Sequence, residues 1–121
     1  MMSSLSKYIK VSTSFQGFHR YINAPEEVSF LREWHRHLFK IEVSISVDDG
    51  NRELEFFIVK NALNAYLQST FEQKQFELSC EMVAEKIIED FLKPNYGNRL
   101  YKVEVSEDGE NTGGVISNPR L

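Results

Sequence analysis

The clearest pattern in the sequence is an alternation of apolar and polar residues over residues 35–48. One face would carry His35, His37, Phe39, Ile41, Val43, Ile45 and Val47. The other face would carry Arg36, Lys40, Glu42, Ser44 and Ser46. A period of two residues predicts a half-buried β-strand, because successive side chains of a strand point to opposite faces of the sheet. The Asp48-Asp49-Gly50-Asn51 segment predicts a tight turn after it.

Three other segments have the composition or the alternation of strands. Residues 8–19 are rich in β-branched and aromatic residues, and Gly17 within them predicts a bulge or a point of close backbone approach. Residues 100–107 alternate again, and residues 113–117 predict a short last strand. Residues 20–34 are expected to form a long connection, with a helical turn as a candidate element within it.

Two segments follow helical spacing instead. Apolar residues in 56–71 recur at the intervals of one helix face. After a polar link, Ser79 can cap a second helix, which Pro94 and Gly97 are expected to close. The order strand, strand, helix, helix, strand, strand (ββααββ) predicts the α+β class, with a four-stranded antiparallel sheet and two helices on one face.

Composition narrows the classes of function. The 121 residues suit a single domain spanning 1–121, and 14 basic against 18 acidic residues give a net charge of −4. This balance argues against nucleic acid or an anionic membrane as a partner. No stretch approaches the roughly 20 apolar residues of a membrane span, and residues 1–7 do not resemble a signal peptide. A single cysteine, Cys80, cannot form an internal disulfide, so we expect a cytoplasmic protein.

The three histidines are the strongest chemical signal in the chain. His35 and His37 stand two apart on the predicted strand, so their rings project the same way about 6.5–7 Å apart. His19 ends the preceding strand and can lie beside them in an antiparallel pair. Three histidines with one open position form the pattern of a catalytic zinc site. The alternative is that His35 and His37 are strand-end residues satisfied by ordinary hydrogen bonds.

Five segments, taken in order, resemble those of the 6-pyruvoyl- and 6-carboxy-tetrahydropterin synthases. The first two are Phe15-Gln16-Gly17-Phe18-His19 and Trp34-His35-Arg36-His37-Leu38-Phe39. The others are Glu55-Phe56-Phe57, Ser79-Cys80-Glu81-Met82-Val83-Ala84 and Val103-Glu104-Val105-Ser106-Glu107. The resemblance covers roughly residues 11–117, nearly the whole chain, and agrees with the order of elements predicted above.

The resemblance implies a tunnelling fold (T-fold), in which subunits join their sheets into a barrel with active sites between them. It implies zinc held by His19, His35 and His37 and a substrate of the dihydroneopterin triphosphate type. Glu107 would bind the guanidine-like edge of the pterin through paired hydrogen bonds, and Glu81 would help to position it. The alternatives are a solvated acid for Glu107 and a helix-dipole role for Glu81. The open sheet edges also favour a homo-oligomer, a trimer-based ring or a hexamer.

The chain departs from the family at several catalytic positions. No cysteine precedes the histidine pair, so Glu33 is the candidate base, with an exposed loop acid as the alternative. No histidine follows His37, so the family's Asp-His pair is missing. Arg36 replaces a glycine and could meet a phosphate. Cys80 matches a small residue of the family at the start of a helix, not its catalytic cysteine.

Two functions are therefore open. The first is a zinc-dependent carbon–oxygen or carbon–carbon lyase that converts dihydroneopterin triphosphate, or a related pterin, to a 6-substituted pterin. The second is a diverged protein that keeps zinc and a pterin or purine pocket without synthase activity. A weaker possibility is a related reaction on another purine-like molecule, as in deazapurine (queuosine) or folate synthesis.

Overall fold

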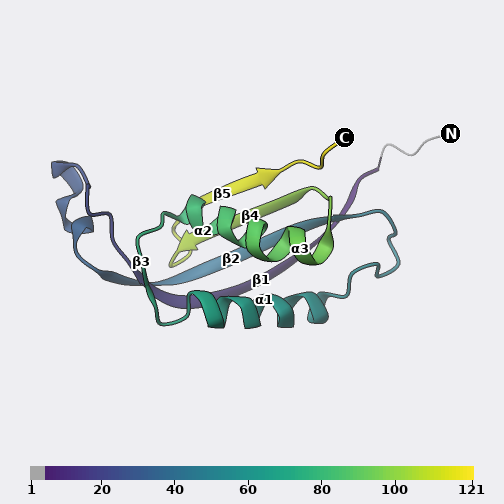
Figure 1. Ribbon diagram of the computed structural model, residues 1–121, viewed down its shortest axis with the longest axis horizontal. Helices are drawn as coiled ribbons and strands as arrows, with labels where there is room; N and C mark the ends of the chain where they lie inside the picture. Colours follow the sequence, from purple (N-terminus) through teal and green to yellow (C-terminus); the bar gives the residue numbers. More distant parts are fainter. Residues whose placement is uncertain (1–4) are drawn as a thin grey trace.

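A computed structural model describes residues 5–121, which form a long curved sheet with helices against one face (Figure 1). The strands are β1 (Lys7–His19), β2 (His35–Val47), β3 (Gln75–Phe76), β4 (Tyr101–Glu107) and β5 (Asn111–Ser117). The helical elements are η1 (Glu26–Arg32, a 3-10 helix), α1 (Phe56–Thr70), α2 (Cys80–Ile87), η2 (Ile88–Leu92, a π-helical turn) and α3 (Lys93–Tyr96). The predicted α+β class is confirmed.

The sheet has the strand order β3-β1-β2-β4-β5. β1 and β2 pair antiparallel along their whole length, from Lys7 opposite Val47 to His19 opposite His35. β4 pairs antiparallel with β2, and β5 with β4. The prediction of four antiparallel strands in the order ββααββ was wrong, because the polar link between the two helical segments contains β3, which runs parallel to β1.

Hydrogen bonds from the link to β1 account for this fifth strand. Gln73 donates its backbone N–H to the Gln16 carbonyl, and Phe18 donates to the Lys74 carbonyl. The ring of Phe76 then lies over Gly17, where an added Cβ would come within 2.9 Å of it. Of the two predictions for Gly17, close approach is confirmed, since β1 and β2 pair here without a bulge.

The core lies between the sheet and the helices. The odd-numbered residues of β1, β2 and β4 face the helices, and those in the middle of the sheet are buried. They include Phe15, Phe39, Ile41, Val43, Tyr101 and Val103. α1 packs on β1, while α2 packs on β4 and β5, so both cover the same face (Figure 1). Since His19, His35, His37 and Glu107 are also odd-numbered, they continue the core face towards one end of the sheet.

The second helical segment runs longer than expected. Ser79 caps it by accepting a hydrogen bond of 3.2 Å from the Met82 N–H, as predicted. Pro94 does not end it but lies within α3, and only Gly97, with φ of +83°, stops it. A proline has no N–H to donate, and the π-helical turn directly before α3 changes the backbone bonding there.

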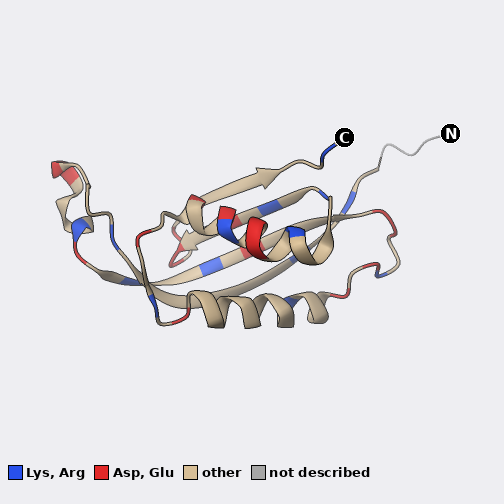
Figure 2. Cartoon of the chain, viewed as in Figure 1, with Lys and Arg blue, Asp and Glu red and all other residues tan. Residues whose placement is uncertain are grey.

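Charge is divided unequally between the helices (Figure 2). α2 and the turns after it carry ion pairs four residues apart, Lys86 with Asp90 and Lys93 with Glu89. α1 carries one charged residue, Lys60, and exposes Phe57 and Ile58 in its first turn. None of the helices between residues 5 and 121 is long and apolar enough to span a membrane.

Candidate metal centre

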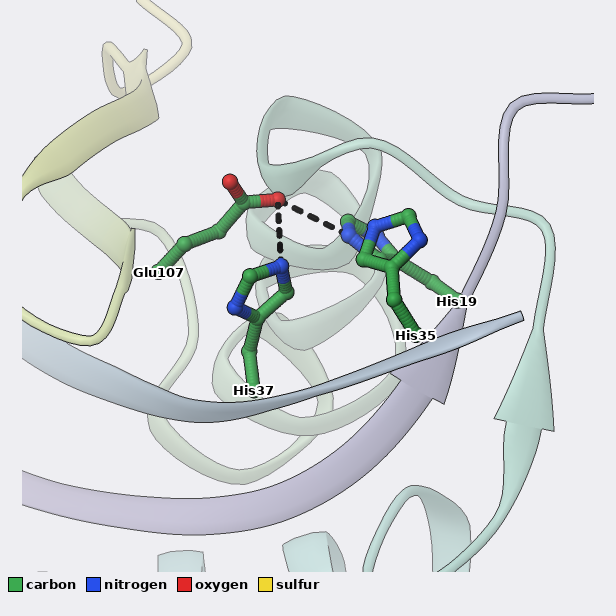
Figure 3. Close-up of side chains that lie close together, drawn as sticks. All are labelled: His19, His35, His37 and Glu107. Carbon is green, nitrogen blue, oxygen red and sulfur yellow. Dashed lines mark ion pairs between the residues drawn. The ribbon is translucent and has the colours of Figure 1, made fainter. Parts of the chain in front are cut away.

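Three imidazole rings meet at the end of the sheet where β1 ends and β2 begins (Figure 3). His19 lies opposite His35 in the antiparallel pair, and His37 follows two residues later on the same face. Ring centroids are 4.5 Å apart for His19 and His35, 5.4 Å for His19 and His37, and 5.0 Å for His35 and His37. The structure therefore brings together the three histidines that the sequence predicted as metal ligands.

Each ring is oriented by a hydrogen bond at Nδ1. His19 Nδ1 lies 3.1 Å from the Leu78 carbonyl oxygen, and His35 Nδ1 lies 2.9 Å from the Glu33 carbonyl oxygen. His37 Nδ1 lies 2.7 Å from a carboxylate oxygen of Asp108. Carbonyl and carboxylate oxygens only accept, so each Nδ1 carries a proton and each neutral ring presents a lone pair at Nε2.

Glu107, the last residue of β4, adds a carboxylate to this group. Its Oε2 atom lies 2.8 Å from His19 Nε2 and 3.9 Å from His37 Nε2 (Figure 3). In a neutral His19 both facing atoms carry lone pairs, so an approach of 2.8 Å requires a shared cation, either a proton or a metal ion. Burial lowers the pKa of His19 below its ordinary 6.5, and this outweighs the Leu78 carbonyl and Glu107, which raise it. Either cation would satisfy this geometry.

The remaining atoms also fit a metal ion. Among the described residues, His35 Nε2 is buried and has no hydrogen-bond partner, which is costly unless another group binds it. One ligand atom from each of His19, His35, His37 and Glu107 lies within 4.8 Å of all the others. Neutral imidazole nitrogens and a carboxylate oxygen are ligands that Zn²⁺ takes in proteins. The four residues could hold a divalent ion.

A cavity of about 680 Å³ opens beside this group. His19, His35 and Glu107 line it together with Cys80 and Glu81 from the start of α2. Glu81 reaches over β5 at Gly113, where an added Cβ would come within 2.1 Å of its carboxylate oxygen. The structure thus places Glu81 and Glu107, both predicted as substrate ligands, on one cavity. A volume of this size suits a small organic ligand.

Cys80 lies in the cavity wall but is not an activated thiol. Burial raises its pKa to about 12, and the negative charges of Glu107 and Glu81 add to that effect. A thiolate is the reactive form of cysteine, so a protonated Cys80 is inert at neutral pH.

Glu33 and Arg36 do not line the cavity. Glu33 caps the end of η1 with an exposed side chain, although its carbonyl oxygen orients His35. Arg36 is an even-numbered residue of β2 and points to the opposite face of the sheet from His35 and His37. The alternation of apolar and polar residues along β2 already predicts that Arg36 and the two histidines lie on opposite faces.

Two residues near the site were missed by sequence reasoning. Arg20 lines the cavity, where its guanidinium lies 4.4 Å from the centroid of the Trp34 ring and its Nε 2.6 Å from Glu77. Its place directly after His19 is the only signal for it in the sequence. Asp108 contacts His37 from the turn after β4, and its position next to Glu107 pointed to it only weakly.

Comparison with known proteins relates the fold to one group of enzymes. The sequence matches no protein-family model and no curated protein. Among solved structures, 6-pyruvoyl tetrahydropterin synthase from Caenorhabditis elegans is similar with a TM-score of 0.73 and 16% identity, over 98% of this chain and 100% of that one. The Plasmodium vivax enzyme, in a variant that replaces a catalytic glutamate by cysteine, has a TM-score of 0.68 and 16% identity, over 95% of this chain and 99% of that one. The Plasmodium falciparum enzyme has a TM-score of 0.65 and 16% identity, over 93% of this chain and 98% of that one. The chain therefore has a tetrahydropterin-synthase-like fold.

Proposed function

We propose that this chain is a diverged, zinc-dependent protein of the 6-pyruvoyl/6-carboxy-tetrahydropterin synthase type that acts on dihydroneopterin triphosphate or a related pterin. One observation carries the proposal: His19, His35, His37 and Glu107 offer ligand atoms within 4.8 Å of one another, and all but His37 line a cavity of about 680 Å³. The shared fold of the structural neighbours supports it. We also assign the protein to the cytoplasm, a reducing compartment that suits a chain with one free cysteine.

The proposal assigns roles to the three histidines and to two glutamates. His19, His35 and His37 would hold zinc, which when bound supplies Lewis-acid polarisation of substrate oxygens. Glu107 and Glu81 present carboxylates to the same cavity, where they can accept paired N–H groups from the edge of a pterin. Glu107 is near enough to the histidines to serve the metal as well, and it can exchange that contact for the ligand's N–H groups.

Proton removal is assigned to Glu33, and contact with a phosphate to Arg36. The Plasmodium vivax neighbour has a glutamate as a catalytic residue, which supports a glutamate as the residue that removes the proton. Both side chains are exposed and outside the cavity of their own chain, so a movement or a second subunit must bring them to a ligand. Arg20 already lines the cavity and is the nearer cation for an anionic group.

A homo-oligomer, trimer-based or hexameric, is part of the proposal. β5 forms one edge of the sheet, and most of β1 forms the other because β3 pairs only with its last two residues. Unpaired strand edges favour pairing with another chain. Ile22 in the cavity lining, Phe30 in η1 and Phe57 on α1 are exposed, and a subunit contact would bury them.

The second candidate is a pterin- or purine-binding protein without synthase activity. Cys80 supports it, since the one cysteine of the chain is held protonated and no histidine follows His37 to relay protons. Such a protein would keep the metal and the carboxylates of the cavity but turn over no substrate.

The test is to incubate zinc-loaded protein with dihydroneopterin triphosphate and to follow products by mass spectrometry, with His37→Ala as the control. Turnover that His37→Ala abolishes would establish the enzyme. If zinc-loaded protein shows no turnover but pterins raise its melting temperature, the binding protein is the correct function. If it shows no turnover and neither pterins nor guanine nucleotides raise the melting temperature, both functions are wrong.

A further inference from the structure

Asp108 occupies an unusual position in the turn between β4 and β5. Its φ is +57°, a left-handed conformation in which aspartate is one of the few tolerated non-glycine residues. This conformation turns its side chain away from its own hairpin and onto the neighbouring strand β2. There Oδ1 accepts a hydrogen bond of 2.9 Å from the Leu38 N–H, and Oδ2 lies 2.7 Å from His37 Nδ1.

The partner of His37 differs in kind from those of the other two histidines. His19 and His35 donate Nδ1–H to neutral backbone carbonyls, whereas His37 donates to a carboxylate. A charged acceptor forms a stronger hydrogen bond and increases the electron density that the ring offers through its other nitrogen. Of the three histidines, His37 therefore has the Nε2 lone pair that binds a metal ion most strongly.

Asp108 also holds the backbone together at this point. Its own N–H donates to the Leu38 carbonyl at 2.8 Å, so the residue forms three hydrogen bonds with two consecutive residues of β2. Glu107 directly precedes it in the chain. The same contacts therefore set the position of Glu107 relative to His37, which is 3.9 Å between Oε2 and Nε2.

We propose that Asp108 is a positioning residue of the metal centre. It holds His37 with the proton on Nδ1 and the lone pair of Nε2 towards the metal, and it fixes the end of β4 so that Glu107 meets the same point. The inference rests on the proposed metal site but not on any substrate or reaction.

Asp108→Asn is the decisive variant. Asparagine has an NH₂ group where aspartate has its second oxygen, so one of the two donors, the Leu38 N–H or His37 Nδ1–H, faces another donor instead of an acceptor. Asp108→Gly is the second variant, because glycine adopts a φ of +57° without strain and removes the side chain altogether. Asp90→Asn is the matched control: Asp90 is an exposed carboxylate paired with Lys86, outside the cavity.

Two measurements on the intact chain separate positioning from a merely structural role. Competition with a chelator gives the zinc Kd, and we expect Asp108→Asn and Asp108→Gly to bind about 10- to 100-fold more weakly, while Asp90→Asn equals the wild type. Long-range ¹H–¹⁵N spectra of the metal-free protein at pH 8 give the tautomer of His37. The wild type should show Nδ1–H, and both Asp108 variants should shift towards Nε2–H.

Unchanged zinc affinity, or an unchanged His37 tautomer, in folded Asp108→Asn and Asp108→Gly would overturn the inference. An equal loss of affinity in Asp90→Asn would overturn it too, since the effect would then follow from charge alone. If the wild type binds no zinc, the proposed function is wrong and the metal part of the inference fails with it. The spectra would still decide whether Asp108 sets the proton position on His37.

Discussion

The ring of Phe39 packs against two of the three histidines, so replacing it should weaken both the stability of the fold and the binding of zinc. Phe39 is fully buried, with ring centroids 5.0 Å from His19 and 5.7 Å from His37. The rings of Phe15 and Phe76 also lie against it, with centroids 5.1 Å and 5.5 Å away. It therefore belongs both to the core and to the metal centre.

Phe71 offers a matched control. It is also buried and contacts Phe15 at 5.2 Å and Phe76 at 5.3 Å, but no histidine ring. Substitution by leucine keeps most of the apolar volume at either position. Loss of the two phenylalanine ring pairs, each worth about 0.5–1.5 kcal/mol beyond burial, should lower the free energy of unfolding by about 1–3 kcal/mol in both variants.

Zinc affinity should separate the two variants. Phe39→Leu removes the surface against which His19 and His37 pack, and we expect about tenfold weaker zinc binding. Phe71→Leu should bind zinc like the wild type. Urea unfolding of the metal-free proteins and chelator competition supply the two quantities. If Phe39→Leu and Phe71→Leu are equally stable and bind zinc equally well, the ring of Phe39 does not orient the histidine ligands.

Two further predictions concern the cavity and the far end of the sheet. At Gly113 the three atoms nearest to an added Cβ all belong to the flexible side chain of Glu81, so Gly113→Ala should keep the fold while pterin-induced stabilisation falls. Gly114→Ala places its Cβ 2.6 Å from a backbone carbonyl oxygen and should destabilise the protein. Melting temperatures with and without ligand test both variants, and equal behaviour would contradict the geometry. At the opposite end, hydrogen bonds from the Asp49 N–H, the Arg99 side chain and the Asp48 N–H hold the pKa of Glu53 at about 2 against an ordinary 4.5. The folded state favours the ionised group, so this contribution is complete above pH 4.5 and is lost as the pH falls towards 2. Glu53→Gln should be less stable at neutral pH and less sensitive to acid over that range, and parallel stability curves for the two proteins would contradict this.

The sequence predicted the parts of the fold that depend on the regular spacing of apolar residues along the chain. Alternation in residues 35–48 placed two histidines on the apolar face of β2, and the structure has them there. The same alternation placed Arg36 on the other face, yet the family resemblance suggested it for the site. The structure has Arg36 on that face, because side-chain direction on a strand follows directly from backbone geometry, and its proposed contact with a phosphate therefore needs a movement or a second subunit.

Features that depend on contacts between distant segments could not be predicted. β3 exists because two residues of a polar link bond to the end of β1, and no periodicity is possible in so short a strand. Asp108 reads in the sequence as an ordinary turn acid. Only the pairing of β4 with β2 brings it to His37, across most of the length of the chain.

That separation has a consequence for the order in which the protein folds. β1 and β2 are neighbours in the chain, so His19, His35 and His37 can meet as soon as one hairpin closes. Glu107 and Asp108 arrive only when β4 docks on β2, a contact of large sequence separation that forms slowly. If the hairpin closes first, a nascent chain would hold the three histidines together before the two carboxylates reach them. In the proposed zinc protein, metal bound at that stage would hold the hairpin together, and metal bound after β4 has docked would hold β4 against β2.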